Sequence, residues 1–444
     1  MFLHKNLSLR LGFNRKRMSI LSRLRWLCGL GLFLAAALLR ANADATLLLE
    51  EPYGHFGAFT STGHAAVYLS RVCAESPTVL RHCAEGETGI VISRYNRIDG
   101  YDWVAIPLLP YLYAVENSDD IPLYANPKIV AFLRNEYRKK YLEAIAPDTP
   151  SGEPPEGNWT QLVGSAYDRT IYGFTIETTP EQDDLFIAAY NDRPNRMHFN
   201  LILHNCADFA KGVINFYYPH SLHRNLIADV GITTPKQDAK LLVKFSARHP
   251  QLQSSSFIIP QVPGSLGRST PVHGVVESVL KAKKYLLPVA VLHPVVTAFM
   301  AVAYVGDGRF DPARHAMISE SGTDLQPPLN GSERRIYQSE ISAVLPPSET
   351  RREAKNWTHL ETSGEPRLDA DGRLALRLNV DGEPVDVGIS RNNIDGAPPE
   401  VGSELMAARL RMELQRGDPR ASSTQVLDDW KLLQRFTAAD AKGD

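Results

Sequence analysis

Cys206 and His64, far apart in the chain, are the two residues whose types could together carry chemistry. Cys206 follows Asn205, whose side-chain oxygen suits a helix N-cap because it can accept from the free amides of a first helical turn. The positive end of a helix dipole lowers the pKa of a thiol there and favours the nucleophilic thiolate. The alternative is a small apolar residue buried at a strand–helix junction, since free cysteine is among the most buried residue types.

His64 opens the segment His-Ala-Ala-Val-Tyr-Leu, which alternates as a strand does, with Val67 and Leu69 on one face. The preceding Gly63 allows another backbone or a ligand to come close. A histidine in a strand can have a purely structural role. Together with Cys206, however, it completes the minimum set for acyl transfer through a thiol.

The elements that must position this pair follow from hydrophobic periodicity. We expect a short strand at 199–203 that leads into a helix, in which Phe209, Val213 and Phe216 recur at helical spacing. We expect the His64 strand to pair with residues 89–95 as a hairpin.

A third group that orients the imidazole must come from this hairpin or its neighbours. The pairing brings Ser93, Tyr95 and Asn96 towards His64, and the Asn96 amide could hold the imidazole tautomer. Asn96 is better explained as a turn residue. Ser93, Glu75 and Asp102 therefore stay open as alternatives.

The order of the two motifs resembles a known family. His64-Ala-Ala-Val-Tyr-Leu69, followed far downstream by Asn205-Cys-Ala-Asp-Phe209, resembles the circularly permuted NlpC-type branch of the papain-like superfamily, to which lecithin–retinol acyltransferase belongs. The resemblance implies an α+β fold in which an antiparallel sheet packs on the cysteine helix. It also implies Cys206 as nucleophile and His64 as general base and acid. The chain departs from the acyltransferase relatives in lacking a second histidine soon after the first strand; His82 lies further on.

The amino terminus and the cysteines both indicate export. Basic residues precede the apolar run 26–39, and a small-x-small cleavage site follows near residue 43, so residues 1–43 are predicted to be a signal peptide or an N-terminal anchor. Cys73 and Cys83 flank a short polar loop and are natural disulfide partners in an exported protein. With Cys28 inside the apolar run, Cys206 is left as an unpaired thiol, which supports its use in catalysis. We expect a periplasmic or cell-envelope protein, with or without a membrane anchor.

Charge and motif content exclude several classes of function. The 48 basic and 50 acidic residues give a net charge of −2, which offers no electrostatic footprint for nucleic acid. The sequence contains no metal-ligand cluster or phosphate-binding loop, so we predict neither a metal nor another cofactor.

The chain is predicted to have four parts. After residues 1–43 come a papain-like domain at 46–260 with a helical insertion near 108–160, an apolar segment at 281–306, and a small C-terminal α/β unit at 307–444. In that last unit we expect a β-meander at 367–390 and surface helices at 400–415 and 425–436.

The apolar segment allows three interpretations. Residues 285–305 carry no formal charge and have about the length needed to cross a bilayer. Pro288, His293, Pro294 and the lysines that precede them argue against a span. A membrane helix, a buried apolar helix and a hairpin in one leaflet bent at Pro294 all remain open.

Two functions are compatible with these features. The first is an exported thiol-dependent hydrolase or acyltransferase that acts on an amide or ester bond of a cell-wall peptide or a lipid, close to a membrane. In it the backbone amide of Cys206 would contribute to an oxyanion hole. The second is a catalytically silent envelope protein that uses the papain-like core as a binding module.

Overall fold

The structure is a computed structural model, and it describes residues 44–54, 61–96, 98–122, 124–197, 199–262, 264–319, 324–335, 339, 364–380 and 382–390. The predicted signal peptide or anchor at 1–43 lies outside the described residues. So do the predicted helices at 400–415 and 425–436.

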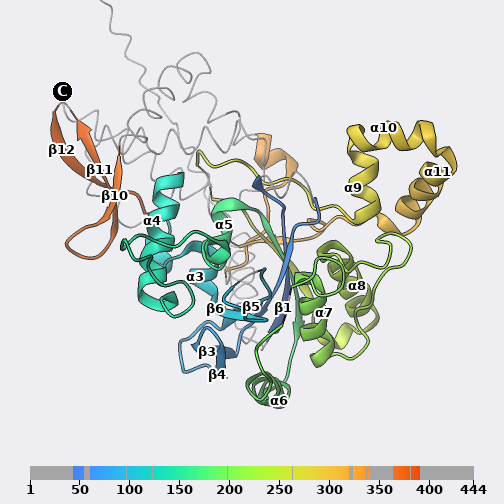
Figure 1. Cartoon of the computed structure of the whole chain (residues 1–444), viewed down its shortest axis with the longest axis horizontal. Coiled ribbons are helices and arrows are strands. Elements are labelled where there is room, and N and C mark those ends of the chain that lie inside the picture. The colour runs from blue at the N-terminus through green and yellow to red at the C-terminus, as the bar shows by residue number, and fades with distance from the viewer. Residues whose placement is uncertain are drawn as a thin grey trace, which may run out of the picture. The chain divides into compact units, whose positions relative to one another are not determined.

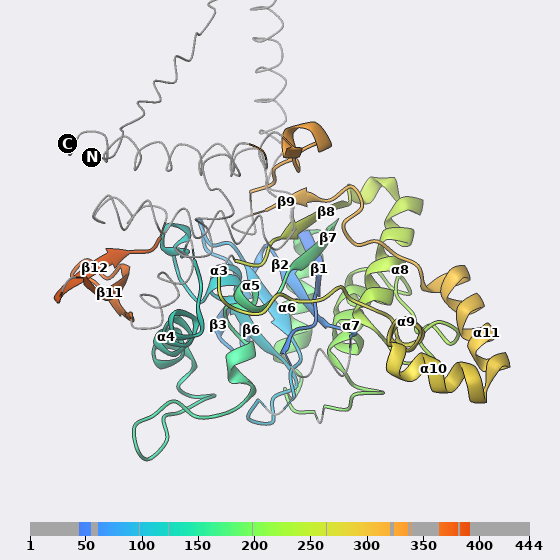
Figure 2. The ribbon, with the colours of Figure 1, turned by 90° about the horizontal axis from the view of Figure 1, so that it is seen from above.

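A seven-stranded sheet forms the core, in the order β6-β5-β2-β1-β7-β8-β9 (Figures 1 and 2). Neighbouring strands are antiparallel except β8 and β9, which run parallel. The strands are β1 (Asp44–Glu50), β2 (His64–Leu69), β5 (Ile90–Ser93), β6 (Val104–Pro107), β7 (Ile171–Glu177), β8 (Ser255–Ile259) and β9 (Met317–Ile318).

Helices pack on both faces of this sheet, because its central strands are apolar on both sides. On β1, Leu47 and Leu49 belong to one buried cluster and Leu48 to the other. The first cluster includes side chains of α6 (Pro180–Asn191), α7 (Cys206–Tyr217) and α8 (Pro235–Arg248); the second includes those of α3 (Leu108–Tyr113), α4 (Pro127–Tyr137) and α5 (Ser165–Asp168). This mixed arrangement around a largely antiparallel sheet confirms the predicted α+β class.

Local signals in the sequence place several elements correctly. The predicted hairpin forms, with β2 paired to β5 so that Val67 lies opposite Ile92. Thr179 and Thr234 cap α6 and α8 as their positions suggest.

Two predicted elements are wrong. Residues 199–203 form an exposed turn instead of a strand, because the Asn200 side chain accepts hydrogen bonds from the amides of Ile202 and Leu203 (2.9 and 3.1 Å). The sequence around 251–271, rich in Ser, Pro and Gln, suggests a loop, yet it contains β8.

The predicted apolar segment consists of two helices, α10 (Lys283–Leu292) and α11 (Pro294–Ala303), which follow α9 (Val275–Lys281). The helix breaks at His293 (φ −139°, ψ 67°), because the residue before a proline disfavours the helical region. Within the described residues, no helix combines the length and the apolar character needed to cross a membrane. The interpretation of 285–305 as one spanning helix is therefore not supported.

The described C-terminal residues attach to the same core. β9 adds to the edge of the large sheet beside β8. The expected meander is present as a second sheet of β10 (Glu365–Leu368), β11 (Leu374–Val380) and β12 (Glu383–Gly388). Its Leu374, Leu376 and Leu378 share a buried cluster with apolar residues of α4.

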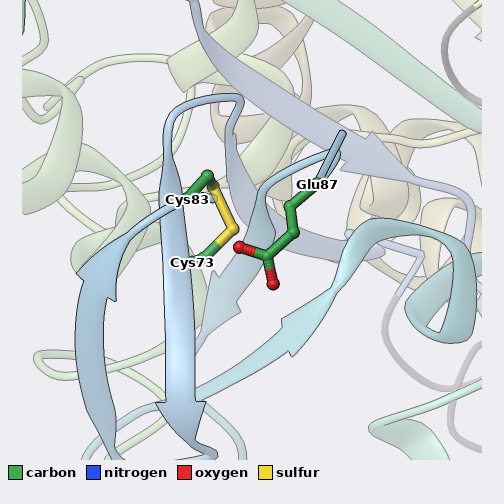
Figure 3. Close-up of side chains that lie close together, drawn as sticks. All are labelled: Cys73, Cys83 and Glu87. Carbon is green, nitrogen blue, oxygen red and sulfur yellow. A yellow bond between two sulfur atoms is a disulfide. The ribbon is translucent and has the colours of Figure 1, made fainter. Parts of the chain in front are cut away.

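A disulfide joins Cys73 and Cys83, as predicted, with their Cα atoms 4.8 Å apart. The bridge ties the small hairpin of β3 (Val72–Ser76) and β4 (Val79–His82), and the Glu87 carboxylate lies beside it (Figure 3). Arg81 pairs with Glu87 at 2.6 Å and lowers the pKa of that carboxyl to about 2. Because both sulfur atoms are held in the disulfide, this group of three side chains is not a metal site in the oxidised protein.

Loss of the bridge is expected to cost stability but not the fold. The closed loop is short, so Cys73→Ala together with Cys83→Ala should lower the free energy of unfolding by about 2–3 kcal/mol. Urea unfolding monitored by circular dichroism measures this. Addition of a reductant to the unsubstituted protein should give the same shift and should leave the double variant unchanged. A linked peptide pair containing Cys206 in the non-reduced digest would contradict the pairing.

Candidate functional site

Cys206 occupies the first position of α7 and is the free cysteine of the described residues. Asn205 caps the helix, as predicted: its Oδ1 accepts from the Asp208 amide at 2.9 Å, and the Asp208 carboxylate accepts from the Asn205 amide at 3.4 Å. The thiol is only partly exposed to solvent. The sulfur therefore lies at the start of a helix whose capping box, the reciprocal hydrogen bonds between Asn205 and Asp208, is complete.

Two loops hold this helix start in place. The Asn205 side-chain amide donates to the carbonyls of Leu201 and Thr233, both at 3.0 Å. Asp208 in turn accepts from Thr233 at 2.6 Å and from Arg224 at 2.8 Å. Cys206 is thus mounted on a rigid junction between the 200–204 turn and the 224–233 loop.

His64 begins β2 directly after Gly63, whose φ is +72°. A Cβ on Gly63 would lie 2.1 Å from the Glu50 carbonyl oxygen, so only glycine fits this close approach of β1. The imidazole stacks on the Tyr95 ring, with centroids 4.7 Å apart and planes 21° from parallel. His64 Nε2 lies 2.8 Å from Ser93 Oγ.

The hydrogen bonds around Ser93 determine the His64 tautomer. Ser93 donates its single hydroxyl proton to the Ala65 carbonyl at 2.9 Å, because a carbonyl can only accept. The Ser93 oxygen must therefore accept from His64 Nε2–H. This leaves His64 Nδ1 without a proton and able to act as a base.

The cysteine helix packs on the strand that His64 opens, since Ala207 and Ala65 belong to one buried cluster. The backbone amides of Ala65 and Ala207 lower the pKa of the Cys206 thiol. His64 precedes Ala65 in the chain. In the described part of the chain, no hydrogen bond joins the His64 ring to the Cys206 sulfur. The two groups therefore stand on neighbouring elements without being bonded to each other.

The protonation states differ from the predicted thiolate. Burial raises the pKa of the Cys206 thiol to about 11, and the nearby carboxylates of Glu50 and Asp238 add to this, while the two amides oppose it. Burial, with a contribution from Arg169, lowers the pKa of His64 well below its ordinary value. The expected effect of the helix dipole is outweighed by desolvation, and at neutral pH the site holds a neutral thiol and a neutral imidazole.

The structure separates the candidates for the orienting group. Asn96 does not face His64: it is exposed, and its carbonyl accepts from the Asn158 side chain at 2.8 Å. Glu75 is exposed on β3, and Asp102 pairs with Arg94 at 2.6 Å. Ser93, one of the alternatives, is the candidate that forms a hydrogen bond with the imidazole, while Tyr95 stacks on it.

A buried acidic network behind the histidine was missed by sequence reasoning. Glu50 lies opposite His64 in the strand register and is fully buried. It pairs with Arg169 at 3.0 Å and accepts hydrogen bonds from Ser165 at 3.2 Å and from Tyr111. The available signal was an acidic residue that ends the apolar run Leu47-Leu-Leu49, but the sequence gives no register that places it at His64.

Alkylation of Cys206 should be slow at neutral pH. Because its pKa is raised to about 11, the rate of carboxamidomethylation by iodoacetamide should keep increasing with pH beyond pH 9, and it should reach no plateau below pH 10. Mass spectrometry of the Cys206 peptide follows the rate. Free glutathione, treated alongside, should level off about two pH units earlier. A plateau below pH 8 would show that the helix dipole prevails over burial.

Comparisons with known proteins leave the family open. No protein-family model matches the chain, and no curated protein matches it. A solved structure that matches is the crystal structure of a Type VI secretion system effector, TseH, at 15% sequence identity. The match covers 50% of this chain and 94% of that chain, with a TM-score of 0.23. A TM-score this low does not establish a common fold.

Proposed function

We propose that this protein is a thiol-dependent acyl hydrolase or acyltransferase with Cys206 as nucleophile and His64 as general base and acid. One observation carries the proposal. The helix α7, which begins at the free thiol of Cys206, packs against β2, which begins at His64, and the His64 ring keeps an unprotonated Nδ1. A thiol beside an oriented base is the arrangement that acyl transfer requires.

The neutral state of the pair suggests how the first step proceeds. His64 Nδ1 removes the thiol proton as the sulfur attacks the substrate carbonyl, after a small movement that brings ring and sulfur within hydrogen-bonding distance. The tetrahedral oxyanion is stabilised by the backbone amide of Cys206 at the start of α7.

The later steps use the same groups. The C–O or C–N bond of the substrate breaks, and His64 returns its proton to the leaving alcohol or amine, which leaves a thioester on Cys206. Water or an acceptor nucleophile then attacks the thioester, with His64 as base again. Ser93 is a positioning residue, because it accepts from Nε2–H and thereby holds the tautomer in which Nδ1 carries no proton.

The wider proposal covers fold and location. We infer a permuted papain-like core from the order of the elements, with the histidine strand β2 before the cysteine helix α7, and from the packing of Ala207 and Ala210 with Ala65 and Val67. The Cys73–Cys83 disulfide supports an oxidising compartment, and hence an exported, cell-envelope protein. The substrate class is a cell-wall peptide or a lipid ester.

A catalytically silent binding module is the second candidate. It is favoured by the raised pKa of the Cys206 thiol and by the lack of a described hydrogen bond between that thiol and His64. In that case the same core would bind a ligand without cleaving it.

Trapping of the thioester distinguishes the two candidates. The full chain is mixed with p-nitrophenyl acetate at pH 8, quenched in acid and digested, and the Cys206 peptide is examined for an acetyl group. We expect a stoichiometric burst of p-nitrophenol and an acetylated Cys206. Cys206→Ser should show neither, and should unfold at an unchanged denaturant concentration. Acetylation that never exceeds that of free glutathione would favour the silent module.

A further inference from the structure

The helices α10 and α11, together called the apolar arm here, expose a dense group of large apolar side chains. Figures 1 and 2 both show them at the edge of the molecule, beyond α8 and α9. Phe299 is 61% exposed and Val295 80%. Other exposed members of the arm are Leu287, Val291, Leu292 and Val302. Soluble proteins rarely leave such a contiguous surface uncovered unless it binds something.

The arm lacks the polar face that a surface helix normally has. Residues 285–305 contain no Asp, Glu, Lys or Arg, and Ala303 is the one buried residue among the described side chains of α10 and α11. A protein partner would cover one side of such a helix and leave the others in water. Helices that are apolar all round match surroundings that are apolar all round, and this favours lipid over a protein surface.

The dimensions of the arm fit one leaflet. Each helix has 10 residues and is therefore about 15 Å long. The hydrocarbon core of a bilayer is about 30 Å thick, so neither helix reaches further than half of it. The bend at His293 keeps the two helices from acting as one longer rod.

The base of the arm is polar and fixed to the core. Lys236 pairs with Glu277 of α9 at 2.6 Å, and the Val275 amide donates to Asp229 at 2.8 Å. The loop that carries Asp229 also exposes Leu226 (78%) and Val230 (66%) beside this base. In the sequence, Lys281, Lys283 and Lys284 stand where the apolar run begins, a position that suits anionic headgroups.

We infer that the apolar arm inserts into one leaflet of a phospholipid bilayer, with Leu226 and Val230 at the headgroup boundary. The docking is rigid, because the hydrogen bond at the base ties α9 to the 224–233 loop that holds the start of α7, and the ion pair ties α9 to α8. This inference does not rest on the proposed chemistry: the Cys206→Ser chain should dock equally well.

Hydrogen–deuterium exchange of the full chain tests the docking locally, so that binding through residues 1–43 does not interfere. Vesicles of phosphatidylcholine with phosphatidylglycerol should slow exchange in peptides from 283–303 by more than about tenfold. Peptides from α6, where Leu185 is also 64% exposed, should be unchanged.

A variant and its matched control complete the test. Leu292→Glu with Phe299→Glu should remove the protection of the arm, since charged side chains are costly in hydrocarbon; both positions are exposed, so the fold is retained. Leu185→Glu should leave the protection of the apolar arm unchanged. Equal protection in the double variant, or none in the unsubstituted chain, would overturn the inference. So would protection that rises with protein concentration without vesicles, which would identify a second copy as the occupant.

Discussion

Replacement of His64 by glutamine is expected to slow acylation of Cys206 by about 10²–10⁴-fold, the usual contribution of a general base. The effect should be this large because burial raises the pKa of the thiol to about 11. Almost no thiolate is then present before the reaction, so attack depends on removal of the proton by His64. The p-nitrophenol burst with p-nitrophenyl acetate measures the acylation rate. Because the pKa of His64 is lowered, the loss of rate towards acid in the unsubstituted protein should begin below the ordinary histidine range.

Three further measurements show whether the loss of rate comes from the base function of His64. His82→Gln, at an exposed histidine, should acylate at the normal rate. Alkylation of His64→Gln by iodoacetamide above pH 10 should stay within a few-fold of normal, since the sulfur itself is intact. Ser93→Ala should lower kcat about tenfold with little change in KM, as expected for a residue that acts only through the imidazole. An unchanged burst in His64→Gln would remove His64 from the mechanism.

Replacement of Arg169 by methionine should lower the free energy of unfolding by about 3–5 kcal/mol. Arg169 and Glu50 pair at 3.0 Å and are both buried, so removal of the guanidinium leaves an uncompensated carboxylate in the core. Arg81→Met, which breaks an exposed pair with Glu87, should cost less than about 1 kcal/mol. Denaturant unfolding at pH 7 measures both.

The pH dependence and a second substitution identify the cause. Burial raises the pKa of Glu50, and loss of Arg169 removes an interaction that lowers it. Glu50 in the folded Arg169→Met protein therefore keeps its proton to a higher pH than in the unsubstituted protein. The stability deficit of the variant should grow as pH rises above the raised pKa that Glu50 has in the unsubstituted protein, and it should shrink below that pKa. Adding Glu50→Gln should recover much of the lost stability at pH 7. A deficit that is the same at pH 5 and pH 8 would point to lost packing instead.

The fold was predictable where the signals are local. The N-caps Asn205, Thr179 and Thr234 depend on one side chain and the next turn, and all three cap helices. The disulfide follows from two cysteines that flank a short polar loop. The pairing of β2 with β5 follows from the alternation of apolar residues in the first of these strands and from their order in the chain.

The electrostatics of the site were not predictable, because they depend on contacts distant in sequence. The pKa of Cys206 is raised by burial and by the carboxylates of Glu50 and Asp238. Both carboxylates are distant from Cys206 in the sequence. Asp238 is fully buried, and its carboxylate oxygens have no hydrogen-bond partner among the described residues. Ser93 contacts His64 whereas Asn96 turns to solvent, since β5 ends at Ser93 and the chain leaves the sheet within three residues.

The protonated Cys206 also bears on how long the protein survives in an oxidising compartment. Thiolates, far more than thiols, react with peroxides and disulfides. With a pKa of about 11, only about one Cys206 in ten thousand is ionised at pH 7. The sulfur would therefore resist sulfenic acid formation and mixed disulfides while no substrate is bound. If the proposed mechanism holds, oxidants would damage the sulfur mainly during turnover, when His64 takes the proton.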